Sequence, residues 1–184
     1  MNKLLKIIVS LVQIGGGLLG LGLIVLSFLN EQPTQMVIKF HIIFGCVFLF
    51  GVVAGLVLII RPRKGLVLSA LFQAVQIPLF IKSGIAYAMS SGACVNLYKH
   101  ASGWGFNFFF GSRYSFSLNS ERPWLIGINI VALVLFVFLI KEICFFKSFE
   151  KSREFRSVRS YPARRVPQAQ PHLENSSPLR HIYH

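Results

Sequence analysis

The sequence predicts an all-α integral membrane protein, a four-transmembrane-helix bundle with a small extracytoplasmic β-hairpin between its third and fourth helices. Composition supports this fold class, because the 184 residues are 54% hydrophobic and only 14% charged, with a mean hydropathy of +0.62. Soluble domains carry roughly 25% charged residues. The chain also holds four long apolar stretches and one segment of alternating aromatic residues.

Each apolar stretch is long enough to cross the bilayer, which needs about 20 residues for its roughly 30 Å hydrocarbon core. The four predicted spans cover residues 4–29, 37–60, 65–89 and 123–146. The third contains Pro78, but neighbouring helices can satisfy the carbonyl group that a proline leaves unbonded. The first resembles a secretory signal in its preceding lysines, yet it is longer than a signal's apolar core and is expected to stay uncleaved.

Lysine and arginine are distributed unequally between the two sides of the predicted bundle. On one side, two basic residues precede the first span, three lie between the second and third spans, and nine lie from Lys141 to Arg180. Five lie on the opposite side. This asymmetry predicts cytoplasmic termini and an external hairpin loop. The tail, residues 147–184, is expected to continue the fourth helix to about Ser157, to be disordered beyond it, and to bind anionic lipid headgroups.

Small residues on the first two spans predict close helix packing. Gly16 and Gly20 share one face of the first span, and Gly51 and Gly55 form a small-residue pattern on the second. Small side chains let helix backbones approach closely, so these two faces are expected to meet. A homodimer through one glycine face is the alternative.

Amide and hydroxyl side chains form a predicted intramembrane polar seam. Its members are Gln13, Ser69, Gln73, Gln76 and Asn129. Gln13 and Gln73 lie at similar depth by the helical rise, which favours a hydrogen bond between them. The seam serves either as structural glue between helices or as a polar cavity for a small ligand or ion. Lys82, near the outer end of the third predicted span, is a candidate interface lysine that either snorkels outward or contacts lipid phosphate or an acidic group such as Glu121.

No pattern in the chain predicts catalysis, a cofactor or a metal ion. The candidate groups on the outer side are scattered and lack ligand spacing: His41, His100, Cys94, Glu31 and Glu121. Cys94 and His100 are six residues apart, which is no signature of a nucleophile and its base. The three cysteines are expected at different depths, so no intramolecular disulfide is predicted, and a bridge between molecules through Cys94 is the alternative.

The segment "GWGFNFFFGSRYSFSLN" places a large apolar side chain at almost every second position, which is the signal for a β-strand. We expect a hairpin over about 104–118 with a connection at 111–113, which pairs Phe108 with Phe116. One face then carries Trp104, Phe106, Phe108, Phe110, Tyr114, Phe116 and Leu118. That face either docks on the protein's own helices as a lid, lies at the membrane interface, or binds another protein.

These features predict a non-enzymatic accessory or interaction protein whose hairpin is a recognition surface. A small transporter or channel subunit using the polar seam is the main alternative, and a lipid-modifying membrane enzyme is a further one. The expected partners are the lipid bilayer, anionic headgroups, and a membrane protein or a second copy of the chain. Nucleic acid is not expected, because the basic residues flank apolar segments instead of clustering on a soluble face.

Overall fold

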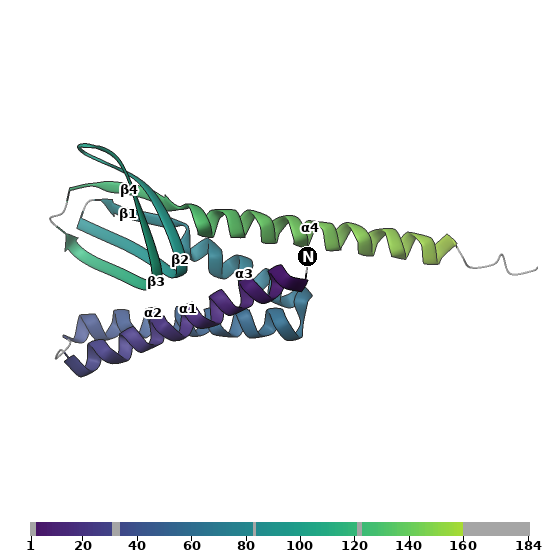
Figure 1. Ribbon diagram of the computed structural model, residues 1–184, viewed down its shortest axis with the longest axis horizontal. Helices are drawn as coiled ribbons and strands as arrows, with labels where there is room; N and C mark the ends of the chain where they lie inside the picture. Colours follow the sequence, from purple (N-terminus) through teal and green to yellow (C-terminus); the bar gives the residue numbers. More distant parts are fainter. Residues whose placement is uncertain (1–2, 31–33, 83, 121–122, 160–184) are drawn as a thin grey trace, which may run out of the picture. The chain divides into compact units, whose positions relative to one another are not determined.

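The computed structural model describes residues 3–30, 34–82, 84–120 and 123–159, without the side chains of 118–120 and 149–159. This part contains four helices and one four-stranded antiparallel sheet (Figure 1). The helices are α1 (Lys3–Asn30), α2 (Gln35–Ile60), α3 (Pro62–Gln76) and α4 (Ile130–Arg159). The strands are β1 (Pro78–Lys82), β2 (Gly84–His100), β3 (Gly103–Ser120) and β4 (Leu125–Asn129). The chain divides into two units, Met1–Ser148 and Phe149–His184, and all four strands and the packed core belong to the first.

The prediction of an all-α four-span bundle is wrong. Within the described residues only α1 and α2 are long and apolar enough to cross a membrane, judged by length and composition. The third predicted span is helical only as far as Gln76. Pro78 explains the end of α3, because proline has no amide hydrogen and disfavours helical geometry at the preceding residue. Residues 78–82 and 84–89 form strands instead.

The fourth predicted span is also divided between a strand and a helix. Residues 125–129 form β4, and α4 begins only at Ile130. Asn129 caps the helix, since its Oδ1 accepts a hydrogen bond from the Ala132 amide at 3.3 Å. The described helix runs to Arg159, and residues 160–184 of the predicted basic tail lie outside the described residues.

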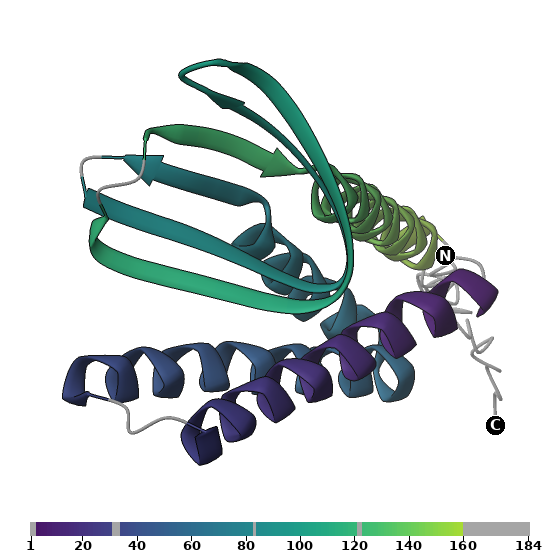
Figure 2. The ribbon, with the colours of Figure 1, turned by 60° about the vertical axis from the view of Figure 1, so that its left-hand side comes forward.

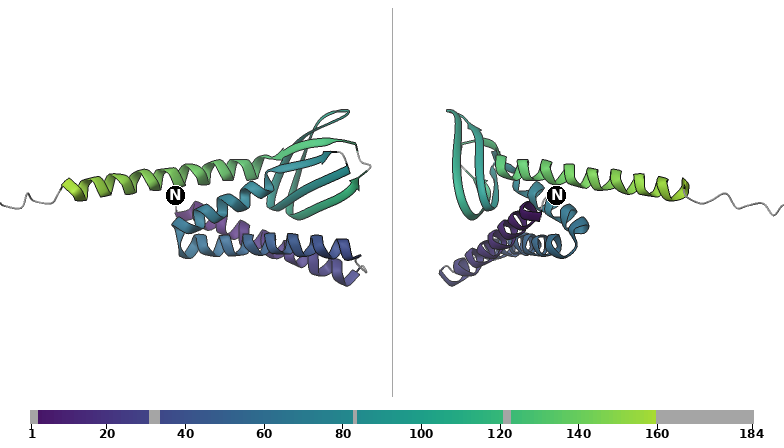
Figure 3. Two further views of the ribbon diagram at one scale, coloured as in Figure 1. Left: turned by 180° about the vertical axis from the view of Figure 1, so that it is seen from behind. Right: turned by 45° about the vertical axis from the view of Figure 1, so that its right-hand side comes forward.

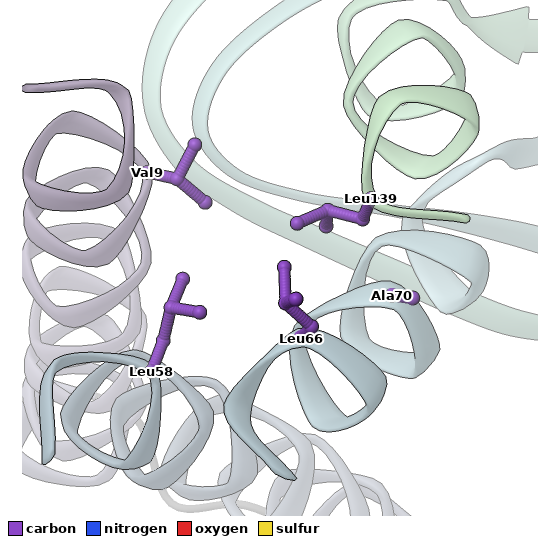
Figure 4. Packing of buried hydrophobic residues seen from close by; sticks show 5 residues of the cluster. All are labelled: Val9, Leu58, Leu66, Ala70 and Leu139. Atoms are coloured by element: carbon purple, nitrogen blue, oxygen red, sulfur yellow. The ribbon is translucent and has the colours of Figure 1, made fainter. Parts of the chain in front are cut away.

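The four helices meet in one apolar cluster. It contains Val9, Leu58, Leu66, Ala70 and Leu139, one or two from each helix (Figure 4). These side chains are nearly fully buried, which removes their apolar surface from the surroundings. Through Leu139 this cluster connects α4 to the first three helices. Along the chain the sheet lies between α3 and α4 (Figure 3).

β2 and β3 form a long two-stranded ribbon that bends in the middle. They pair from Gly84 with Ser120 to His100 with Gly103, and Ala101 and Ser102 make the turn. At the bend Gly92 pairs with Gly111, and their φ angles are +90° and +131°. Residues with a side chain rarely adopt such angles, so glycine on both strands permits the bend.

The bend lets a single ribbon pair with two different strands. The first half of β2 pairs with β1, its second half pairs with β4, and β1 and β4 pair with each other (Figure 2). The sheet therefore curves around one of its faces. We call this the inner face; it carries Ala88, Asn96, Asn107, Arg113 and Ser115, and the outer face carries their neighbours along each strand.

The hairpin predicted within residues 104–118 is wrong as well. Segment 103–120 is one continuous strand, in which Phe110 pairs with Ala93 and Tyr114 pairs with Met89 of β2. Because side chains alternate along a continuous strand, the even-numbered aromatic residues still share one face, the outer one. The side chain of Leu118 lies outside the described part.

The outer face of the first ribbon half packs on α1 and α2. The ring centroids of Phe116 and Phe40 are 4.3 Å apart, and those of Tyr114 and Phe44 are 5.0 Å apart. Ser112 Oγ donates a hydrogen bond to the carbonyl oxygen of Gly16. A side chain at Gly16 would collide with the β2 backbone, so this glycine permits the close contact between α1 and the sheet.

Candidate functional site

An exposed apolar surface lies on the outer face of the second ribbon half. Four side chains of β3 form what we call the outer aromatic band: Trp104, Phe106, Phe108 and Phe110. Each exposes between 65% and 75% of its surface. The strand register places Leu97 of β2 beside Phe106, and Ile128 of β4 beside Leu97. The band therefore extends across three strands as one apolar surface.

The bend explains why one face has two different environments. The rings of Tyr114 and Phe116 pack against α2 and are partly buried, whereas the side chains of the band, on the other side of Gly111, are largely exposed in the described part of the chain. Tyr114 and Phe116 are thus packed against the protein's own helices, and the four residues of the band are exposed. At the end of the band Lys99 Nζ lies 5.7 Å from the centre of the Trp104 ring, within the range of a cation–π contact.

An apolar groove connects the band with α1. Its α1 side consists of Gly15, Leu18, Leu19, Gly22, Leu23 and Leu26, and its sheet side consists of Phe109, Phe110, Gly111 and Ser112. Gly15 and Gly22 leave open space where a side chain would stand. The apolar surface of α1 thus continues without interruption into the band.

All five residues of the predicted polar seam are buried, with exposed fractions of 3% or less. Ser69 Oγ donates to Gln13 Oε1 at 2.9 Å, so Gln13 pairs with Ser69 where a partner in Gln73 was expected. The Ser91 amide donates to Gln76 Oε1 at 2.7 Å, which ties α3 to β2. Asn129 caps α4. The first two bonds join α1 to α3 and α3 to β2, and the role of the seam as structural glue or as a polar cavity stays a prediction.

The predicted glycine contacts are divided among three neighbours. Gly20 lies against Phe48 of α2, and Gly55 lies against Ile14 and the Ser10 carbonyl of α1. These two glycines therefore stand at the expected contact between α1 and α2. Gly16 faces the sheet instead, and Gly51 faces the ring of Phe72 in α3.

Lys82 and Cys94 occupy positions that sequence reasoning did not foresee. Lys82 ends β1 and is exposed, so it is no lysine on a membrane helix. Cys94 is 1% exposed, and Asn96 Nδ2 donates to its Sγ at 3.7 Å, so it is not accessible for a bridge to another molecule. Cys94 and His100 are separated by about 20 Å of strand, too far for a nucleophile and its base. The described residues contain no group of three or more potential metal ligands.

A second candidate site, the inner-face cavity, was missed by sequence reasoning. It measures about 240 Å³ and is partly open to the surroundings. Its polar lining comes from Ser90, Asn96, Tyr98, Asn107, Arg113 and Ser115. The polar residues alternating with the aromatic ones in β3 were a signal for this face, but the interpretation of 111–113 as a turn and of 78–89 as helix removed the strands that complete it.

Comparison with protein families, curated protein sequences and solved structures finds no match for this chain. Its function is therefore inferred from the geometry of the outer aromatic band and the inner-face cavity.

Proposed function

We propose that this is a non-enzymatic membrane protein, anchored by α1 and α2, that uses the outer aromatic band as its interaction surface. The lipid at the bilayer interface is the proposed occupant of the band. The observation that carries the proposal is the exposure of four large aromatic side chains in a row on one strand face. Exposed apolar surfaces of this kind mark binding surfaces, because water solvates them poorly.

The two helices support a membrane location. α1 has 28 residues and α2 has 26, which at 1.5 Å per residue correspond to about 42 Å and 39 Å, longer than a bilayer's hydrocarbon core. Leu11, Leu18, Ile42 and Ile43 each expose more than half of their surface. A core helix of a soluble protein would bury such side chains, whereas lipid covers them at no cost.

The charges at one end of the pair support an orientation. Lys6 Nζ donates to the Ile59 carbonyl at 3.1 Å, so the start of α1 lies beside the end of α2. Arg61, Arg63 and Lys64 follow immediately. Basic residues concentrate on the cytoplasmic side of membrane helices, so we assign this end to the cytoplasm and the connection between α1 and α2 to the opposite side.

The position of β3 in the sheet favours a location of the outer aromatic band at the membrane interface over one in the hydrocarbon core. β3 is the last of the described strands in the sheet order, so the backbone groups on one of its edges face no other described strand. Such an edge is not tolerated in hydrocarbon, where no water can satisfy it. At headgroup depth water remains available, and tryptophan beside a lysine, as in Trp104 and Lys99, is typical of that zone.

The proposal can be tested with Trp104 as a fluorescent reporter, because the chain has only two tryptophans. The Trp124→Phe variant is reconstituted into phosphatidylcholine liposomes that contain lipids brominated at different depths. We expect strong quenching by bromine close to the headgroup and weak quenching by aqueous iodide. Trp104→Phe, which keeps Trp124 outside the band, is the matched control for background quenching.

The opposite pattern would contradict the proposal. If iodide quenches Trp104 in liposomes as strongly as in denatured protein, and brominated lipid does not, the band is not covered by lipid. Photo-crosslinking from position 108 in native membranes then separates the two remaining cases, a protein partner or a second copy of the chain.

A further inference from the structure

We propose that the inner-face cavity binds a phosphate monoester group, with the Arg113 guanidinium as its principal ligand. This inference goes beyond the proposed function, because it concerns the opposite face of the sheet and does not require lipid on the outer aromatic band. It depends on the strand register, on the unpaired polar groups of the lining and on the size of the cavity.

The register brings polar side chains from different strands to neighbouring positions. Arg113 of β3 pairs with Ser90 of β2, and Asn107 of β3 pairs with Asn96 of β2. Because paired residues share a face, all four point toward the inner face and line the same cavity. The curvature that follows from the glycine bend brings these two pairs around one space, although they are separated along the ribbon.

These polar groups have unused hydrogen-bonding capacity. Within the described residues neither Arg113, Ser90, Asn107 nor Ser115 makes a hydrogen bond or ion pair through its side chain. Ser90 is only 5% exposed, so its hydroxyl group can reach little besides the contents of the cavity. The lining thus presents one guanidinium group and several neutral donors to a common space.

The charge of the lining selects the ligand class. No aspartate or glutamate is among the described lining residues, so nothing there neutralises Arg113. Guanidinium binds phosphate through two parallel hydrogen bonds, and these charge-assisted bonds are stronger than neutral ones. The neutral hydroxyl and amide donors can then bind the remaining phosphate oxygens, which a carboxylate with two oxygens would satisfy less completely.

The size of the cavity limits what the phosphate carries. About 240 Å³ is below the roughly 300 to 1,000 Å³ typical of drug-sized ligand pockets. Leu79, Ile81 and Leu125 supply apolar walls, and Ala86 and Ala88 keep the space open because their side chains are small. A headgroup with a short carbon fragment fits these limits. Glycerol phosphate meets them both as a free molecule and as the head of phosphatidic acid.

Two probes distinguish a phosphate monoester on a lipid headgroup from a soluble phosphate monoester. The full-length protein in detergent micelles is titrated with sn-glycerol 3-phosphate by microscale thermophoresis, and the protein in nanodiscs is compared in phosphatidylcholine with and without phosphatidic acid. Binding of the soluble probe in micelles identifies a soluble phosphomonoester. Binding only in nanodiscs with phosphatidic acid identifies the lipid headgroup.

The variants test the residues that carry the inference. R113Q should weaken phosphomonoester binding at least tenfold, and N107L, at an exposed position, should weaken it several-fold while the fold is kept. K82Q is the matched control, because it removes an exposed cation of the same sheet that does not line the cavity, and it should bind as the unchanged protein does. R113K retains the charge without the two-pronged geometry and should give an intermediate affinity.

The inference is overturned if neither probe binds, if R113Q binds as tightly as the unchanged protein, or if K82Q weakens binding as much as R113Q. Should R113Q fail to fold, as judged by circular dichroism, N107L and R113K decide by the same criteria. Because the micelle titration needs no contact between lipid and the outer aromatic band, its result is independent of the tryptophan-quenching experiment.

Discussion

Truncation of two aromatic residues on the same face of β3 should have very different effects on stability. Phe108 lies in the outer aromatic band and exposes 65% of its surface. Tyr114 lies beyond the glycine bend, where its ring centroid is 5.0 Å from that of Phe44 and 5.9 Å from that of Phe48. We expect Tyr114→Ala to destabilise the protein strongly and Phe108→Ala to change its stability little.

The magnitude can be worked out from the contacts. Truncating a fully buried aromatic residue costs roughly 3 to 5 kcal/mol, and each aromatic pair contributes about 0.5 to 1.5 kcal/mol of its own. Tyr114 is half-buried and makes ring contacts with His41, Phe44 and Phe48, so we expect a loss of about 2 to 4 kcal/mol. Among the described residues Phe108 makes no aromatic ring contact, and its truncation should change the stability by no more than about 0.5 kcal/mol.

The free energy of unfolding can be measured by titrating sodium dodecyl sulfate into the protein in mixed micelles, followed by near-ultraviolet circular dichroism. Tyr114→Phe is the control, because it keeps the ring and removes only the hydroxyl group. Equal destabilisation by Phe108→Ala and Tyr114→Ala would refute the bent ribbon. It would show that the whole aromatic face is packed, as the lid hypothesis requires.

Three further predictions concern single residues. Burial raises the pKa of Tyr87 from 10.0 to about 12. The tyrosine of the unfolded chain therefore ionises at lower pH than that of the folded protein, so the free energy of unfolding should fall as the pH rises from about 10 to 12. When unfolding is followed against pH, this fall should be less steep in Tyr87→Phe. Asn129→Ala removes the cap of α4 and should cost about 1 kcal/mol of unfolding free energy, whereas Asn129→Ser should retain most of it. A variant with Cys94 as its single cysteine should resist maleimide in mild detergent and react after denaturation; rapid labelling of the native protein would contradict its burial in β2.

Local properties of the sequence predicted some of these features. α1 and α2 come from two long apolar segments, and both are helices of the length that a membrane span needs, as those segments predicted. The alternation of aromatic residues in 104–116 predicted a strand with one apolar face, because side-chain direction along a strand depends only on position. The matched depths of the polar residues also brought Gln13 close to α3, although its partner proved to be Ser69.

Strand pairing could not be predicted in the same way. Two alternating runs separated by Gly111 fit a hairpin and a bent continuous strand equally well, and only the partner decides between them. That partner, residues 84–100, is rich in small residues, and its first part, 84–89, follows an apolar helix and was assigned to the third predicted span. β-sheet hydrogen bonds join residues far apart in the chain, and local propensity carries little information about them.

The sequence by itself therefore determined the apolar helices α1 and α2 and the alternation that separates aromatic from polar side chains along β3. Tertiary structure decided that β2 pairs with β3, that the ribbon bends where Gly92 meets Gly111, and that Tyr114 is packed while Phe108 is exposed. It also decided that Arg113, Ser90 and Asn107 share a cavity. The physical reason is that helix formation and side-chain alternation depend on neighbouring residues, whereas register and curvature depend on contacts between distant ones.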